Sequence, residues 1–328
     1  MCAVQIKFPG FCDLQINGFA GVDFNDPQTT PDDLHRTLTA LRATGVTRLL
    51  PTLITSPLEN FAACARTLTG LGAPAIAGLH MEGPYISPDD GPRGAHRREY
   101  VCAASVEDFR RRQEAAGGAI RLVTLAPEVP GALELIEYLA AQKIIVAIGH
   151  SAATPEQIRD AIKAGARLST HLGNGCALTM PRHPNLIWEQ LAADKLTASF
   201  IMDGHHLPPA TAKVMLRVKS AERSLLVTDA MAAAGCPPGR YKIGGTEVEL
   251  SANGSVAAPG AQVLSGSSLT MPVAVANTVR FTDLPISMAL GLASTLPAAL
   301  LGLKPVGTVT ADWTAAAGEL KIQSVKDD

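Results

Sequence analysis

Two histidines end successive apolar runs in the stretch IIVAIGHSAATPEQIRDAIKAGARLSTHLGN, which extends from Ile144 to Asn174. The first run ends at His150 and the second at His171, and the residues between them have helical periodicity. One strand–helix repeat therefore separates the two imidazoles, which in a parallel sheet would emerge from the same edge of adjacent strands. Such a pair suits a shared metal ion. The alternative is that each histidine only ends a strand and packs there.

The segment between the histidines carries the signals of a helix with defined ends. Thr154 is the expected N-cap, Pro155 fits the first helical position, and Gln157 completes a capping box with the threonine. Gly165 can end the helix in the left-handed conformation. We therefore predict a helix that joins two parallel strands.

Composition limits the class of protein and its partners. The chain has 328 residues, of which 47% are apolar and only 4% aromatic, so Ala, Val, Ile and Leu must form the core, as in α/β proteins with buried parallel strands. A net charge of −2 gives no indication of a nucleic-acid partner or an anionic membrane. Without a membrane-length apolar run or a signal-peptide pattern, the expected location is the cytoplasm. Six cysteines without a CxxC pair fit reduced thiols.

Apolar, strand-like runs alternate with helical patterns along most of the chain. Eight strands arranged in this way predict a (β/α)8 TIM-type barrel. A doubly wound open sheet would give a similar alternation, and the count of eight favours the barrel. The expected strands cover residues 8–17, 46–53, 75–82, 120–128, 144–150, the run that ends at His171, 196–203 and 224–229.

The pattern changes after the last predicted barrel strand. Residues 241–264 alternate apolar and polar side chains around Asn253-Gly254, which predicts a β-hairpin inserted before the final helices. The tail also has strand character and could pair with the first residues of the chain. The predicted organisation is a barrel over residues 9–302 with the 241–264 insertion, and a small β element from residues 1–8 and 303–328.

In a barrel the C-terminal ends of the strands form one rim, where active sites lie. One glutamate and two histidines are a familiar catalytic zinc set, with a position left for water. Asp229 could then take and return a proton, although it could also be only the N-cap of the next helix. The polar residues at the predicted rim are Gln15, Asn17, Glu82, Glu128, His150, His171, Asp203 and Asp229.

A series of motifs resembles the N-acetylglucosamine-6-phosphate deacetylases of the amidohydrolase superfamily, over about Pro9 to Gly302. This resemblance implies that Glu82, His150 and His171 are the metal ligands and that Asp229 is the general base and acid. The motifs, in the order and approximate spacing of that family, are GLHMEGPYIS, GAH, VTLAPE, GHSAAT, THLGN, IMDGHH, LVTDAMAAAG and LSGSSLTM.

The resemblance also assigns substrate contacts. His96 resembles the histidine that contacts the sugar near the scissile amide. Asn174, the Gly175 backbone, Arg182 and His206 resemble the groups that hold the sugar and phosphate, with His206 reaching across a homodimer interface. A guanidinium suits a phosphate, but Arg182 could also be a solvated surface residue.

The chain departs from the superfamily at three places. Most amidohydrolases have His-x-His where this chain has Gln15-Ile16-Asn17, so we expect a single divalent metal ion, with Gln15 bonded to a water at the vacant second site. Zinc is the expected metal, although one glutamate and two histidines also accept iron, cobalt or manganese. Relatives have bulkier residues where this chain has Gly173 and Gly175, which could widen the pocket or loosen the loop. The short segments outside the barrel predict a reduced β-sandwich element.

Together these features suggest hydrolysis of the acetamide of N-acetylglucosamine 6-phosphate to glucosamine 6-phosphate and acetate, by metal-bound hydroxide with Asp229 as base and acid. One alternative is an amidohydrolase that acts on an unphosphorylated N-acyl sugar or N-acyl amino acid. Another is a barrel that binds a sugar phosphate without turning it over.

Overall fold

An eight-stranded parallel sheet forms the centre of the computed structural model, which describes residues 3–261 and 263–327. Each barrel strand pairs with the next one along the chain, and a parallel bridge between Ile16 and Ala230 joins the first strand to the residues after the last. The predicted (β/α)8 barrel is confirmed, because a doubly wound sheet would reverse its strand order. The strands are β2 (Phe11–Ile16), β5 (Val46–Ile54), β6 (Leu79–Glu82), β7 (Ile120–Leu125), β8 (Ile145–Ile148), β9 (Leu168–Ser169), β10 (Thr197–Phe200) and β11 (Ser224–Leu226).

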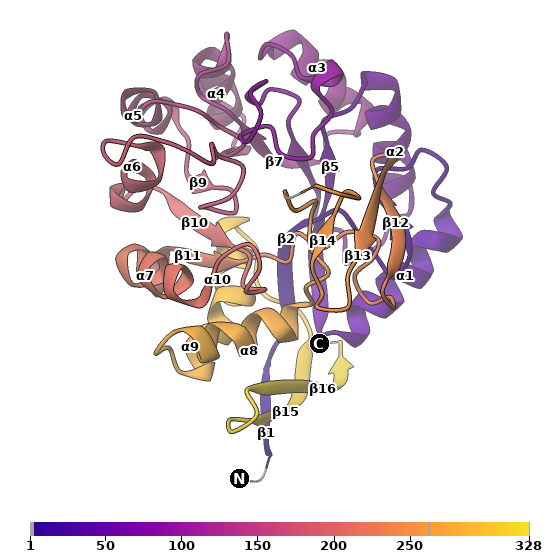
Figure 1. Ribbon diagram of the computed structural model, residues 1–328. Coiled ribbons are helices and arrows are strands. Elements are labelled where there is room, and N and C mark those ends of the chain that lie inside the picture. Colours follow the sequence, from indigo (N-terminus) through magenta and orange to yellow (C-terminus); the bar gives the residue numbers. More distant parts are fainter. Residues whose placement is uncertain (1–2, 262, 328) are drawn as a thin grey trace.

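Helices surround these strands (Figure 1). Their buried faces pack on the outside of the barrel, so both faces of the sheet are covered, as a parallel sheet requires. The helices are α1 (Pro31–Ala43), α2 (Leu58–Gly70), α3 (Val106–Ala115), α4 (Ala132–Ala141), α5 (Pro155–Ala164), α6 (Leu186–Ala192), α7 (Pro209–Lys219), α8 (Met271–Phe281), α9 (Ile286–Ala293) and α10 (Thr295–Leu300), with the short 3-10 helices η1 (Arg98–Tyr100) and η2 (Ala221–Arg223).

Helix α5 has the ends that its sequence predicts. The Thr154 hydroxyl accepts a hydrogen bond from the Gln157 N–H, and the Gln157 side chain accepts one from the Thr154 N–H at 2.8 Å. Pro155 is the first helical residue, and Gly165 ends the helix at a φ of 132°. These local interactions define where α5 begins and ends between β8 and β9. The two histidines are therefore one strand–helix repeat apart.

Several barrel strands end earlier than the sequence predicts. β7 ends at Leu125 rather than 128, and β11 ends at Leu226 rather than 229. Three residues that follow strand ends have positive φ: His150 at 49°, His171 at 29° and Asp229 at 50°. A positive φ is incompatible with the pleat of a strand, so the ladder stops before these residues and their backbones turn at the rim.

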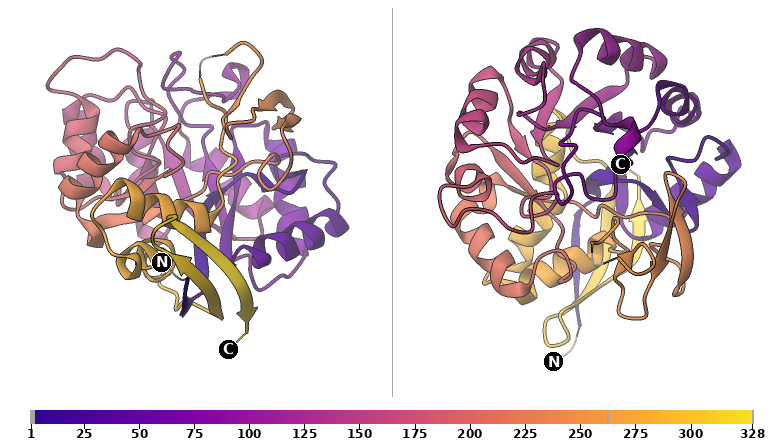
Figure 2. Two further views of the ribbon diagram at one scale, coloured as in Figure 1. Left: turned by 60° about the horizontal axis from the view of Figure 1, so that its bottom comes forward. Right: turned by 45° about the horizontal axis from the view of Figure 1, so that its top comes forward.

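Three antiparallel sheets accompany the barrel in the described part of the chain, two of three strands and one of two. β1 (Val4–Pro9), β15 (Thr308–Thr314) and β16 (Glu319–Lys326) form a sheet at one end of the molecule (Figure 2). β12 (Gly239–Ile243), β13 (Thr246–Leu250) and β14 (Val256–Ala257) form the second, and β3 (Gly18–Phe19) pairs with β4 (Val22–Asp23) in the third.

The turn of the inserted hairpin differs from the prediction. Gly244 and Gly245, both with positive φ, connect β12 to β13, whereas Asn253-Gly254 lies between β13 and β14. The insertion therefore has a third strand that alternation alone did not indicate. The structure does not describe Met1, Cys2, Gln262 and Asp328. The predicted segments 1–8, 241–264 and 303–328 are therefore compared with the structure over their other residues.

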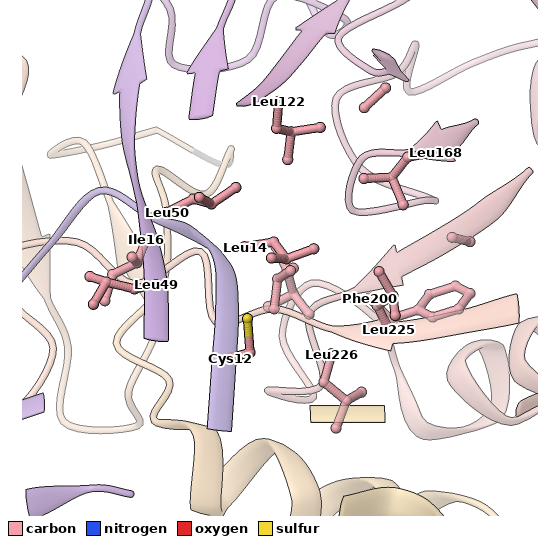
Figure 3. Packing of buried hydrophobic residues seen from close by; sticks show 14 of the residues in the cluster. Cys12, Leu14, Ile16, Leu49, Leu50, Leu122, Leu168, Phe200, Leu225 and Leu226 are labelled. Carbon is pink, nitrogen blue, oxygen red and sulfur yellow. The ribbon is translucent and has the colours of Figure 1, made fainter. Parts of the chain in front are cut away.

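The core is mostly aliphatic, as the composition requires. Leu50, Leu122 and Leu168 are buried on three barrel strands (Figure 3), and each has a threonine two residues later in the chain. Because strand side chains alternate, each threonine lies on the same face as its leucine and nearer the rim. The five cysteines in the described part of the chain are free thiols. No helix built from those residues is both long and apolar enough to cross a membrane.

Candidate active site

Glu82, His150 and His171 converge at the rim. Glu82 ends β6, and the two histidines follow β8 and β9. Glu82 Oε1 lies 3.2 Å from His171 Nε2 and 3.3 Å from His150 Nε2, and the two Nε2 atoms are 3.2 Å apart. Bonds of about 2.0 Å to a tetrahedral ion would separate its ligand atoms by about 3.3 Å. The triangle therefore fits one metal ion.

The surroundings of His150 orient its ring for such a role. Its Nδ1 lies 2.9 Å from the carbonyl oxygen of Pro92. Because a carbonyl only accepts, Nδ1 carries the hydrogen and Nε2 keeps its lone pair toward Glu82 and His171. The His171 backbone N–H donates to Ser199 Oγ at 2.8 Å. A loop residue thus orients the His150 ring, and the neighbouring strand β10 holds the backbone of His171.

Two side-chain amides, one on β2 and one just after it, donate hydrogen bonds to the carboxylates of the site. Gln15 Nε2 donates to Glu82 Oε1 at 2.8 Å and to Asp229 Oδ1 at 3.3 Å. Asn17 Nδ2 donates to Asp229 Oδ1 at 2.7 Å. Gln15 thus ties Asp229 to Glu82, and Asn17 adds a second donor to Asp229.

The two carboxylates differ in their titration. Burial and the charge of Glu82 raise the pKa of Asp229 to about 6. Burial alone would also raise the pKa of Glu82, but hydrogen bonds with His150 and His171 hold it well below its usual value. One carboxylate is therefore a permanent charge while the other can exchange a proton near neutral pH, a pattern typical of acid–base sites.

His96 is buried beside the triangle as a neutral ring. Its ring centroid lies 4.3 Å from that of His150. Its Nδ1 accepts a hydrogen bond from the Thr55 backbone N–H at 3.4 Å and lies 2.8 Å from the Thr55 hydroxyl. Burial and the neighbouring His150 lower the pKa of His96 to about 3. With Nδ1 accepting, Nε2 carries the hydrogen and can donate it to a ligand.

A cavity of about 570 Å³ contains these groups. Glu82, His96 and Asp229 line it, and residues of the insertion contribute to its wall. No arginine or lysine belongs to the lining formed by the described residues. The other polar or catalytic-type residues that line it are Asn17, His150, His171, Asn174, His205 and His206, with the Gly175 backbone.

The two glycines after His171 approach other side chains closely. A Cβ on Gly175, whose φ is 56°, would lie 3.0 Å from His150 Nδ1. A Cβ on Gly173, whose φ is 99°, would lie 2.9 Å from Leu207. The space beside both glycines is therefore already occupied by neighbouring side chains, and both backbones adopt a conformation that favours glycine.

The family model described as "Amidohydrolase family" matches residues 6–317. The chain belongs to the amidohydrolase family. Family membership and the Glu82–His150–His171 triangle together imply that this amidohydrolase holds a divalent metal ion.

Similar proteins share one type of printed activity. The amidohydrolase is 36% identical to the N-acetylgalactosamine-6-phosphate deacetylase of Escherichia coli O157:H7, over 92% of this chain and 80% of that protein. It is 35% identical to the human N-acetylglucosamine-6-phosphate deacetylase, over 98% of this chain and 82% of the relative. The crystal structure of the Mycobacterium smegmatis N-acetyl-D-glucosamine-6-phosphate deacetylase matches with a TM-score of 0.89 and 31% identity, over 98% of this chain and 86% of that one. The resemblance found in the motifs is thus confirmed.

Four of the residues singled out in the sequence of this amidohydrolase lie outside the cavity lining: Gln15, described above, and Glu128, Arg182 and Asp203. Arg182 is exposed on the loop before α6. Glu128 instead accepts hydrogen bonds from Ser151 Oγ at 2.8 Å and the Ala152 N–H at 2.5 Å, and so holds the loop after β8. Asp203 accepts a hydrogen bond from His206 Nδ1 at 2.6 Å, which orients that ring in the cavity.

His205 lines the cavity, and our sequence reasoning did not select it. Its backbone N–H, like that of His206, donates to Asp203 Oδ1 at 2.8 Å. Its Nε2 lies 3.0 Å from the Asn253 carbonyl oxygen, so it also connects the rim to the insertion. The signal was the doubled histidine of the DGHH motif, in which we considered only the second residue.

Proposed function

We propose that this amidohydrolase hydrolyses the acetamide of N-acetylglucosamine 6-phosphate to glucosamine 6-phosphate and acetate. The observation that carries the proposal is the convergence of Glu82, His150, His171, Asp229 and His96 in one cavity. Relatives named for deacetylation of N-acetylhexosamine 6-phosphates support the substrate class.

The metal in this proposal is a single zinc ion held by Glu82, His150 and His171. Three protein ligands leave a position open for water, as in catalytic zinc sites. When bound there, the ion polarises oxygen ligands and lowers the pKa of water to about 7. The amides of Gln15 and Asn17 are poor ligands for a second ion, and Gln15 would instead bond to a water on that side.

Asp229 moves the proton in this mechanism. Its carboxylate takes a proton from the attacking water and gives it to the amide nitrogen as the C–N bond breaks, so acetate and the free amine leave. A pKa of about 6 suits both steps near neutral pH. The hydrogen bonds from Asn17 and Gln15 hold the carboxylate in place during both transfers.

His96 stabilises the charge that develops on the amide oxygen. Its Nε2–H is available because Thr55 occupies Nδ1. A neutral imidazole donates this hydrogen bond without adding a charge beside a bound cation, and a donor aimed at a developing oxyanion typically contributes about 10²–10³-fold to the rate.

The sugar phosphate is held by Asn174, the Gly175 backbone, His206 and, in addition, His205. Arg182 completes the phosphate site in the proposal, either by movement of its exposed loop or from the second subunit of a homodimer. His206 would act within its own subunit rather than across the interface, because its ring lines this cavity and is bonded to Asp203. Action in the cytoplasm, without a nucleic-acid or membrane partner, remains a prediction from the sequence.

An amidohydrolase of unphosphorylated N-acyl sugars or N-acyl amino acids is the second candidate. It is favoured by the lack of arginine and lysine in the cavity lining of the described residues. Acetate release from phosphorylated and free N-acetylglucosamine and N-acetylgalactosamine, combined with metal analysis, separates the candidates. We expect the phosphorylated sugars to react faster and Arg182→Ala to reduce that preference. A zinc-loaded enzyme that releases acetate from no N-acetylhexosamine phosphate would contradict the proposal.

A further inference from the structure

Asp13 is a fully buried carboxylate that the mechanism above does not use. It lies on β2, two residues before Gln15, and strand alternation directs both side chains to the same face. Its Oδ2 accepts a hydrogen bond from the Thr228 hydroxyl at 2.5 Å, and its Oδ1 accepts one from the Thr228 N–H at 3.2 Å. Both oxygens of Asp13 are therefore directed at the residue before Asp229.

The Thr228 hydroxyl also contacts the residue that follows Asp229. Because it donates its single hydrogen to Asp13, its lone pairs are free to accept, and Ala230 donates its N–H to the same oxygen at 3.1 Å. Through this hydroxyl, the residue before Asp229 is hydrogen-bonded to the residue after it. Ser267 Oγ donates to the Thr228 carbonyl at 2.6 Å, so the residue is held at three of its polar groups.

The backbone of Asp229 itself is fully hydrogen-bonded. Its N–H donates to the Gln15 carbonyl at 2.9 Å, and its carbonyl accepts from the Ser267 N–H at 2.9 Å. Its φ of 50° is one that residues other than glycine rarely adopt, so surrounding contacts must enforce it. Asp13 and Thr228 supply contacts on both sides of this residue without reaching the cavity lining.

We propose that Asp13 and Thr228 are a positioning pair that fixes the backbone of Asp229 and thereby sets the rate of proton transfer at its carboxylate. The inference rests on the proposed function, in which Asp229 is the base and acid. Proton transfer needs heavy atoms within hydrogen-bond distance, and a misplacement of about 1 Å can reduce the rate about 10²-fold.

Thr228→Val tests the pair, because valine keeps the shape of threonine and removes the hydroxyl. We expect kcat to fall at least about tenfold, with KM within about twofold of wild type and metal content unchanged. Thr228→Ser, which restores the hydroxyl, should recover most of the rate. The matched control is Thr278→Val, which removes a buried hydroxyl bonded to Ala274 O within α8, far from Asp229 in the chain. It should lower the melting temperature and leave kcat unchanged.

Two results would contradict the positioning role of Asp13 and Thr228: an unchanged kcat in Thr228→Val, or an equal loss of kcat in Thr278→Val. Hydrogen exchange of the amides of residues 227–231 gives a readout that needs no substrate. Exchange there should be faster in Thr228→Val than in Thr228→Ser and Thr278→Val, and equal exchange refutes the inference. If the wild type releases no acetate from any substrate, the proposed function fails, while the exchange comparison still decides whether this hydroxyl holds Asp229.

Discussion

Replacing Asp229 with asparagine tests the proton-transfer step at a position where the rest of the site can stay intact. The side-chain oxygen of asparagine can keep the hydrogen bonds that Asp229 Oδ1 accepts from Asn17 and Gln15. The three atoms of the metal triangle are unchanged, so metal content should equal that of wild type. The substitution therefore removes the exchangeable proton and little else.

The expected loss follows from the role of the carboxylate. General acid–base catalysis contributes about 10²–10⁴-fold, so kcat of Asp229→Asn should fall by at least about 10²-fold. In the wild type, a pKa of about 6 means that the base is about 90% ionised at pH 7 and about 10% at pH 5. Because the charged form is the base, kcat/KM should fall about tenfold between pH 7 and pH 5. The Asp229→Asn variant should not show this fall in kcat/KM at acidic pH, which is the acid limb of the pH–rate profile.

The assay is acetate release from N-acetylglucosamine 6-phosphate between pH 5 and pH 8, with metal content measured on the same samples. Asp203→Asn is the matched control, since it makes the same chemical change at a rim carboxylate that orients His206. It should raise KM and keep the acid limb. Activity of Asp229→Asn within about tenfold of wild type, or an acid limb that persists in it, would refute the assignment of Asp229 as the base.

Three further results are expected. Glu82→Gln should lose most of its bound metal, measured by elemental analysis, because it removes the only negative ligand of the triangle; full metal content would contradict the ligand set. His206→Asn should raise KM for phosphorylated substrates by about tenfold and leave KM for free sugars unchanged, since it removes a proposed hydrogen bond to the phosphate; equal effects on both would speak against that contact. Burial raises the folded-state pKa of Asp13 to about 7, above the unfolded value, so the free energy of unfolding should decrease as pH rises from about 4 to about 7. Urea unfolding should show that Asp13→Asn lacks about 3 kcal/mol of this decrease, and the same pH dependence in the variant and the wild type would contradict the raised pKa of Asp13.

The residues proposed for chemistry share a backbone feature. His150, His171 and Asp229 all have positive φ where their strands meet the rim. Such conformations cost on the order of 1–3 kcal/mol each and persist only where neighbouring contacts enforce them. Here the enforcing contacts come from other strands: Ser199 bonds to the His171 N–H, and the Gln15 carbonyl bonds to the Asp229 N–H. The barrel thus stabilises the local geometry that its active rim requires.

The sequence by itself determined the barrel and the helix between the histidines, and it predicted that His150 and His171 meet at one rim with Glu82. These features depend on local information: the alternation of apolar runs, the capping box at Thr154, and the placement of His150 and His171 at the ends of successive strands. Parallel strands bring their C-terminal ends to one edge, so order along the chain was enough to predict convergence in space.

Only the tertiary structure decided how the carboxylates are held and which residues line the cavity. Asp13 meets Thr228, and Gln15 reaches Asp229, across the closure between the first and last barrel strands, while Gln15 also reaches Glu82 on the third barrel strand. The same packing leaves Arg182 exposed. Such contacts join residues that are far apart in the chain, and they depend on strand register and barrel closure. Local periodicity specifies neither of these, because it records only which face of its own strand or helix a residue occupies.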